Sequence, residues 1–235
     1  MEMMGFSTGA VARSDFRSAL RTIGGLGTGV VELSALRMAE LGPLVAALPG
    51  LDLAAYGYVS VHAPSSFTAG EEPEVVDALR GVTERGWPVV VHPDTIHDHE
   101  LWAGFGSLLC VENMDKRKRG GRNVAELSEV FDLLPDASLC FDMAHARQCD
   151  PSMTEAFAIL REFGGRLRQI HISEVDVASR HVRLTWSGTR AFMEIADMIP
   201  SDLPVVLESP VRPEEMEAEL HEAMKAVGRA PVLQP

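Results

Sequence analysis

Six short apolar segments of this chain each end in a histidine or an acidic residue. Their sequences are YVSVH (58–62), PVVVH (88–92), LLCVE (108–112), LCFD (139–142), RQIH (168–171) and PVVLE (204–208). Apolar, β-branched runs of this length are typical of strands that are buried on both faces of a parallel sheet. One such ending carries little information. Six of them along one chain predict that six ligand-type side chains lie around one rim, as at the C-terminal face of a β/α barrel.

The remaining segments complete a repeating β/α pattern. Two further strands are expected at 4–8 and 28–33, so the eight strands begin near residues 4, 28, 57, 87, 107, 138, 168 and 204. Segments with helical periodicity lie between these strands and after the eighth strand, and most of them end at glycine or proline. The segments are residues 14–23, 35–47, 73–85, 123–134, 154–163, 188–198 and 213–227. Apolar runs that follow helices stopped by Gly or Pro are typical of repeated βα units. We therefore predict an α/β protein, a single-domain (β/α)8 TIM barrel over residues 1–235, with an open doubly wound sheet as the alternative.

Composition narrows the classes of function. The 235 residues carry a formal net charge of -13, which argues against general binding to nucleic acid backbones. No apolar stretch approaches the roughly 18 residues that cross a bilayer, and the N-terminal residues lack a secretory pattern. Of the three cysteines, Cys110 and Cys140 lie inside apolar strands, and Cys149 leaves the number odd. Buried, reduced thiols of this kind predict a cytoplasmic protein with no membrane partner.

The predicted fifth to eighth strands supply four residues that suit a metal ion. These residues are Glu112, Asp142, His171 and Glu208. Side chains i and i+2 of a strand face the same way, so Cys110 points with Glu112 and Cys140 with Asp142 toward the barrel interior. Three carboxylates with one histidine suit Mn²⁺, Mg²⁺, Co²⁺ or Zn²⁺. Each residue alone is better explained by a buried hydrogen-bond network, but the four together predict a divalent metal site.

Three histidines are candidates for contact with a substrate or a second metal ion. His62 and His92 end the third and fourth strands, where the prolines that follow fix their positions at the rim. The alternative for both is a hydrogen-bonded core histidine. His145 comes three residues after Asp142 and is expected on a loop above the metal, where it reaches substrate or a second ion or, alternatively, caps the next helix.

A basic loop follows the fifth strand, and it could clamp a substrate phosphate. A solvated loop is the ordinary explanation for such a run, which consists here of Lys116, Arg117, Lys118 and Arg119. His181 is expected in the loop after the seventh strand, within reach of the substrate. Glu32 is expected to face inward from the second strand, where it would bind a substrate hydroxyl or support a neighbouring side chain.

The strand-end motifs resemble those of a known superfamily. In chain order, VHAP, VVHP, VENM, FDMAH, IHIS and VLE resemble the motifs of the xylose isomerase-like TIM barrels, over about residues 4–210. That superfamily contains sugar and sugar-phosphate isomerases and epimerases, and also endonuclease IV-type phosphodiesterases. The resemblance implies a divalent-metal enzyme in a fold whose members often self-associate, so a homo-oligomer is among the expectations.

The isomerase branch implies a single metal ion, held by Glu112, Asp142, His171 and Glu208. In that branch Glu112 and Glu208 also form the acid/base pair that moves a proton between adjacent carbons, and His145 binds the substrate. On this basis we expect an isomerase or epimerase that acts on a small sugar or sugar phosphate. The chain departs from the branch at Lys118 and Val177, where Glu and Arg are common.

The endonuclease IV branch implies more ions and is the alternative, a multinuclear phosphoester hydrolase. Its first ion would be held by His62, His92 and Glu112, and its second by Glu112, Asp142, His171 and Glu208. Its third would be held in part by His145 and His181, but an aspartate of that group appears here as Ser179. Less expected are a branch whose clustered iron oxidises peptide cysteines, and a barrel that binds a ligand without turnover.

Overall fold

The computed structural model describes residues 3–229, and within that range eight parallel strands close a barrel. The strand order around the ring is β1-β10-β7-β6-β5-β4-β3-β2. The predicted (β/α)8 barrel is therefore confirmed, and the open sheet is excluded. The strands are β1 (Met4–Ser7), β2 (Val30–Ser34), β3 (Tyr58–His62), β4 (Val89–Val91), β5 (Leu109–Glu112), β6 (Ser138–Asp142), β7 (Leu167–Ile172) and β10 (Val205–Leu207).

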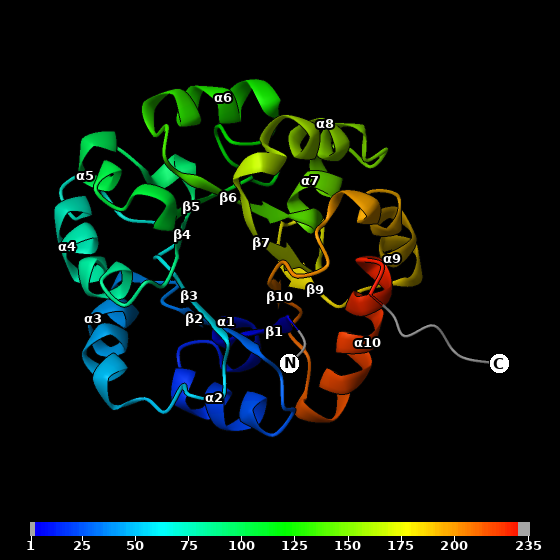
Figure 1. Ribbon diagram of the computed structural model, residues 1–235, viewed down its shortest axis with the longest axis horizontal. Coiled ribbons are helices and arrows are strands. Elements are labelled where there is room, and N and C mark those ends of the chain that lie inside the picture. Colours follow the sequence, from blue (N-terminus) through cyan, green and yellow to red (C-terminus); the bar gives the residue numbers. More distant parts are fainter. Residues whose placement is uncertain (1–2, 230–235) are drawn as a thin grey trace.

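Helices form a ring outside the strands (Figure 1). They are α1 (Thr8–Ala12), α2 (Phe16–Gly24), α3 (Met38–Ala47), α4 (Glu72–Thr83), α5 (His99–Ala103), α6 (Val124–Leu133), α7 (Met143–Cys149), α8 (Thr154–Phe163), α9 (Trp186–Met193) and α10 (Met216–Ala226). Helices α1, α5 and α7 lie outside the predicted helical ranges, because five to seven residues are too few to show a helical period. Among the described residues, no helix is long and apolar enough to cross a membrane.

The strands are apolar because both of their faces are buried. Outward-facing side chains pack against the helices in the main hydrophobic core. Val90, Cys110 and Cys140 form a small cluster of their own, apart from that core. Because strand side chains alternate, Glu112 and Asp142 follow two residues later on the same side as the two cysteines. The polar strand ends therefore lie above an apolar layer of the barrel interior.

A short antiparallel hairpin follows β7 at the barrel mouth. Its strands are β8 (Glu174–Val175) and β9 (His181–Val182). His181, predicted in the loop after the seventh strand, lies in the second strand of the hairpin that this connection forms. The Asp176 side chain closes the turn by accepting hydrogen bonds from the backbone N–H groups of Ala178 and Arg180, at 2.8 and 3.0 Å. Such an Asx-type turn allows the segment to pair with itself.

Candidate metal centre

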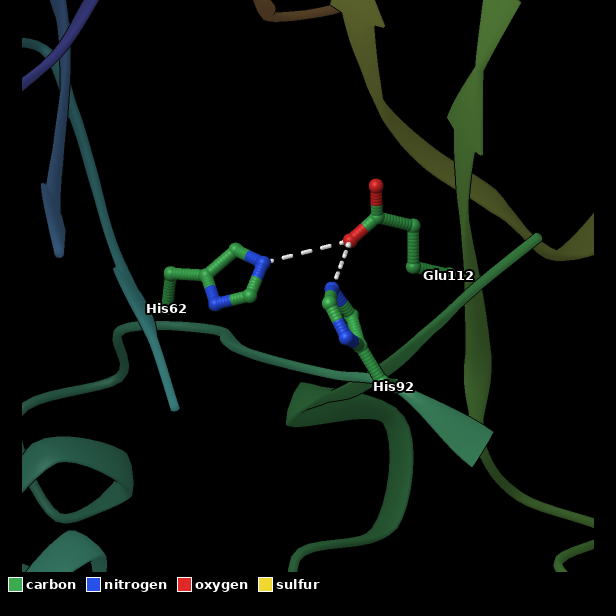
Figure 2. A group of neighbouring side chains, drawn as sticks. All are labelled: His62, His92 and Glu112. Carbon is green, nitrogen blue, oxygen red and sulfur yellow. Dashed lines mark hydrogen bonds and ion pairs between the residues drawn. The ribbon is translucent and has the colours of Figure 1, made fainter. Parts of the chain in front are cut away.

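Glu112, the last residue of β5, lies between two pairs of histidines. Its Oε2 is 3.2 Å from His62 Nε2 and 3.4 Å from His92 Nε2, as Figure 2 shows. Its Oε1 is 3.3 Å from His171 Nδ1 and 3.4 Å from His145 Nδ1. The histidines come from β3, the end of β4, β7 and α7. Both oxygens of this one carboxylate thus face ring nitrogens from separate elements.

Within residues 3–229, the side chains that could hold a metal ion form three groups. In each group the potential ligand atoms lie within 4.8 Å of one another. Two residues, Glu112 and Asp142, each belong to two groups, so the groups adjoin. All members are buried except the partly exposed His181. The groups are His62, His92 and Glu112; Glu112, Asp142, His171 and Glu208; and Asp142, His145 and His181.

The structure brings together the four residues predicted to hold the metal ion. It separates the three histidines predicted for a second ion. His62 and His92 lie with Glu112, whereas His145 lies with Asp142 and His181. His145 is also in the first turn of α7 and not on a loop as predicted. The reason is that Asp142 caps this helix, its Oδ1 accepting a hydrogen bond from the His145 backbone N–H at 2.6 Å.

In the group of four ligand residues, two carboxylates each have an oxygen that accepts no hydrogen bond. Asp142 Oδ2 and Glu208 Oε2 are buried and have no hydrogen-bond partner. Such atoms are rare in proteins, and each one costs about 1–3 kcal/mol when it is left unsatisfied. Divalent cations would satisfy both oxygens and balance the buried negative charge. A set of imidazole and carboxylate donors fits Zn²⁺, Mn²⁺, Co²⁺ or Fe²⁺ better than Mg²⁺, which prefers oxygen ligands and retained water.

Burial and neighbouring charges shift the pKa values of these groups. Burial opposes a charge on His62, but the hydrogen bond to Glu112 and the nearby carboxylates outweigh it and raise the pKa of His62 to about 9. Burial raises the pKa of Asp142 to about 6. Burial would also raise the pKa of Glu112, yet contacts with His171, His62 and His92 hold it well below its usual range. Without metal, the site therefore retains protons on groups that a metal would need deprotonated.

We expect metal affinity to increase with pH across the neutral range. Metals bind deprotonated ligands, and below pH 9 the raised pKa of His62 leaves it mostly protonated. Apparent affinity at this group should therefore fall about tenfold per pH unit below 9. Asp142 adds a second competing proton below about pH 6. Calorimetric Zn²⁺ titrations at pH 7, in buffers with different ionisation heats, should detect proton release. A pH-independent affinity without proton release would contradict this arrangement of ligands.

The predicted basic loop is only partly free to bind a phosphate. Lys118 Nζ forms an ion pair with Asp94 at 2.9 Å, and Arg117 donates a hydrogen bond to the Ala178 carbonyl. The Lys116 backbone N–H is 3.3 Å from Gln148 Oε1. These partners tie the loop to the segment after β4, to α7 and to the turn between β8 and β9. The phosphate-clamp role of Lys116, Arg117 and Lys118 stays a prediction.

His181 lies at the open side of the centre. Its side chain is 31% exposed, and its Nε2 is 3.6 Å from Glu208 Oε2. Its Nδ1 lies 2.8 Å from Ser173 Oγ. Ser179, which replaces an aspartate of the endonuclease IV pattern, donates a hydrogen bond to Asp115 Oδ1 at 2.6 Å instead of pointing at the ligands. His181 is thus the group member most accessible to a substrate.

Two residues of the centre were missed by the sequence analysis. Asn113 joins β5 to β6, because its side chain accepts from the Asp142 backbone N–H at 2.7 Å and donates to the Asp142 carbonyl at 2.9 Å. Nothing in the sequence distinguishes this amide from an ordinary residue after a strand. Gln169 lies inside the barrel beside His171 and Glu32. The i+2 rule could have found Gln169, because it precedes His171 by two positions on one strand.

Similarity to known proteins is found at the level of structure. No protein-family model matches the sequence, and no curated protein matches it. Endonuclease IV from Thermus thermophilus matches 97% of this chain and 99% of its own, with 21% identity and a TM-score of 0.62. The 3-keto-D-glucoside 4-epimerase from E. coli matches 96% of this chain and 99% of its own, with 13% identity and a TM-score of 0.60.

A third similar structure is a protein from Anabaena variabilis described as a sugar phosphate isomerase/epimerase. It matches 94% of this chain and 88% of its own, with 13% identity and a TM-score of 0.55. All three matches lie below 25% identity, and what this chain shares with the three proteins is their fold. The barrel fold that the strand-end resemblance implies is therefore confirmed.

Proposed function

We propose that this chain is a multinuclear divalent-metal hydrolase of phosphate esters. The observation that carries the proposal is the position of Glu112, which belongs both to the group of His62 and His92 and to the group of Asp142, His171 and Glu208. A carboxylate shared by two complete ligand sets is suited to bridge two ions. Paired ions are typical of enzymes that stabilise both the attacking and the leaving oxygen of a phosphoryl transfer.

Each ligand set has a defined task in this proposal. His62 and His92 would hold one ion through the Nε2 atoms that face Glu112 Oε2. Asp142, through its free Oδ2, would share the second with His171 and Glu208. Bound divalent ions would supply Lewis-acid polarisation of the phosphoryl group and lower the pKa of water. The surrounding strands fix the ligands before substrate arrives, which lowers the cost of ordering the site.

The third group would face the substrate. His145 Nδ1 lies 3.0 Å from the Asn113 carbonyl oxygen, so this nitrogen donates and leaves Nε2 as the atom available to ligand or substrate. His181 is the exposed member of this group. We assign these two histidines to contact with the leaving group of the phosphate ester. The contact would be direct or through a third ion held together with Asp142.

An isomerase requires Glu112 and Glu208 to act as an acid/base pair. Effective general acids and bases have pKa values near the working pH. Despite burial, the histidine contacts hold the pKa of Glu112 well below its usual range, and His171 and His181 lower that of Glu208. Without metal, Glu112 is therefore ionised, as a metal ligand must be. Sugar isomerisation or epimerisation remains the second candidate, because it needs only the single metal group of Glu112, Asp142, His171 and Glu208, and all four residues lie together.

The substrate expected is a small phosphate ester. The net charge of -13 opposes approach of a polyanion, and two cations of the basic loop are already engaged by Asp94 and the Ala178 carbonyl. DNA should nevertheless be tested as a substrate, because one of the similar structures is an endonuclease IV. The panel should contain p-nitrophenyl phosphate, bis(p-nitrophenyl) phosphate, sugar phosphates, an abasic DNA duplex and an aldose/ketose set. Metal-dependent phosphate release supports the proposal, and sugar interconversion without phosphate release would replace it with the second candidate.

The double variant His62→Ala/His92→Ala distinguishes the two candidates. For the hydrolase we expect at least one bound ion fewer per chain and a loss of phosphoesterase activity of about a hundredfold or more, because one complete ligand set is removed. A single-metal isomerase would keep its ion. The matched control is His97→Ala/His99→Ala at the start of α5, outside the three ligand groups. Elemental analysis and steady-state assays check both variants, and full phosphoesterase activity in the first would overturn the dinuclear proposal.

A further inference from the structure

Glu32 is a carboxylate inside the barrel that no metal group includes. It lies in the middle of β2 and its exposed fraction is 0%. Its Oε2 accepts hydrogen bonds from Ser60 Oγ at 2.9 Å and from Gln169 Nε2 at 2.8 Å, and it lies 3.1 Å from His171 Nε2. Among the described residues, His171 is the sole basic side chain that pairs with it. The contact with His171 is therefore the one that connects Glu32 to the metal groups.

We propose that Glu32 is a positioning residue that selects the metal-binding nitrogen of His171. A carboxylate only accepts hydrogen bonds, so in this contact His171 Nε2 carries the proton. That leaves Nδ1 with its lone pair, and Nδ1 faces Glu112 Oε1 at 3.3 Å and Glu208 Oε2 at 3.4 Å. The inference rests on the proposed metal site and adds a residue on the side of the imidazole away from the ion.

A competing hydrogen bond makes this assignment testable. Gln169 Nε2 lies 2.8 Å from the same His171 Nε2, and an amide proton given to that nitrogen would force the ring proton onto Nδ1. Nδ1 could then bind no metal. The contact with Glu32 prevails because the carboxylate oxygen accepts the ring N–H, whereas the Gln169 amide nitrogen only donates. Gln169 has its own acceptor in Glu32, so it does not need the ring.

Side chains of two other strands, β3 and β7, hold Glu32 in place for this task. Ser60 is on β3 and Gln169 is on β7, and the Gln169 Oε1 accepts a hydrogen bond from Tyr58 Oη at 2.6 Å. This network fixes the Gln169 amide so that its nitrogen faces Glu32. A fixed carboxylate behind a ligating imidazole orients the ring and increases its basicity, which strengthens metal binding.

The test compares Glu32→Ala and Glu32→Gln with a control at another buried carboxylate. Glu72→Gln is that control, because Glu72 is 1% exposed and accepts hydrogen bonds from the His97 and Asp98 backbone N–H groups and from Trp102 Nε1, outside every metal group. Zn²⁺ affinity is measured by chelator competition. We expect Glu32→Ala to weaken it about 10–100-fold, Glu32→Gln to lose less because its amide oxygen still accepts, and Glu72→Gln to leave it unchanged.

The tautomer of His171 provides a readout that needs no variant. Nitrogen–proton correlation spectra of the Zn²⁺-loaded protein should show a protonated Nε2 and a metal-bound Nδ1. A protonated Nδ1, or wild-type Zn²⁺ affinity in a folded Glu32→Ala chain, would overturn the positioning role. A Zn²⁺-loaded chain that shows the expected tautomer but hydrolyses no phosphate ester would overturn only the proposed hydrolase function. A chain that binds no metal would overturn both.

Discussion

Replacing Glu112 with glutamine is expected to remove metal binding at both ligand sets and phosphoester turnover together. Glu112 is the one residue shared by the His62–His92 set and the Asp142–His171–Glu208 set. The amide that replaces the carboxylate carries no charge and offers one weak oxygen donor where two anionic ones faced four histidines. Because bound ions contribute several kcal/mol to transition-state stabilisation, activity should fall about a thousandfold or more. Elemental analysis and phosphate-release assays on the purified variant measure the two effects.

The same substitution at Glu72 separates a metal effect from a folding effect. Glu72→Gln also neutralises a buried carboxylate that accepts three hydrogen bonds, but these come from the segment that begins α5 and not from the barrel rim. We expect it to lower the free energy of unfolding by about 1–3 kcal/mol while metal content is preserved. If Glu112→Gln kept its ions, or kept activity, the assignment of Glu112 as the shared ligand would be wrong.

Replacing Gly5 with alanine is expected to prevent the barrel from closing normally. Gly5 pairs with Val30 where β1 meets β2, and a methyl group there would lie 1.7 Å from the Val30 carbonyl oxygen. This neighbour is backbone, so relief requires β1 and β2 to separate. Overpacking in a core usually costs about 1–3 kcal/mol, and a clash with strand backbone should exceed this and reach about 4 kcal/mol. Chemical denaturation of the purified variant measures the loss in free energy of unfolding. If the barrel cannot close, we expect the variant to be insoluble on expression.

Gly42→Ala is the matched control for that prediction. Gly42 lies in α3, and a methyl group there meets no atom within 4 Å. Alanine is favoured over glycine in a helix, so we expect stability to be unchanged or increased by about 1 kcal/mol. A folded Gly5→Ala chain with wild-type stability would contradict the register of β1 against β2.

The barrel could be predicted from the sequence because its strands have an unambiguous composition. β-branched apolar runs such as Val89–Val91 are buried on both faces and stand apart from the helices between them. The rim residues could be predicted for a related reason, since the C-terminal ends of parallel strands meet at one face. Neither inference required knowledge of side-chain rotamers.

The grouping of the ligands could not be predicted, because it depends on short elements and on rotamers. His145 lies beside Asp142 through the capped helix α7, which has seven residues and no visible period. His181 is brought to the centre by the β8–β9 hairpin, whose strands have two residues each. The ion pair between Lys118 and Asp94 joins two loops that are distant in sequence. The ion pair is a tertiary contact, and elements as short as α7, β8 and β9 show no period from which they could be predicted.

The number of metal ions per chain shows whether Glu112 is shared by two metal sites. The protein should be purified without chelator and without an affinity nickel step, and its metal content measured by elemental analysis per chain. We expect two or three ions of the Zn²⁺, Mn²⁺, Co²⁺ or Fe²⁺ type, and we expect the Glu112→Gln chain to retain none at the two ligand sets that Glu112 shares. A single ion per chain that survives His62→Ala/His92→Ala, or no ion at all, would contradict it.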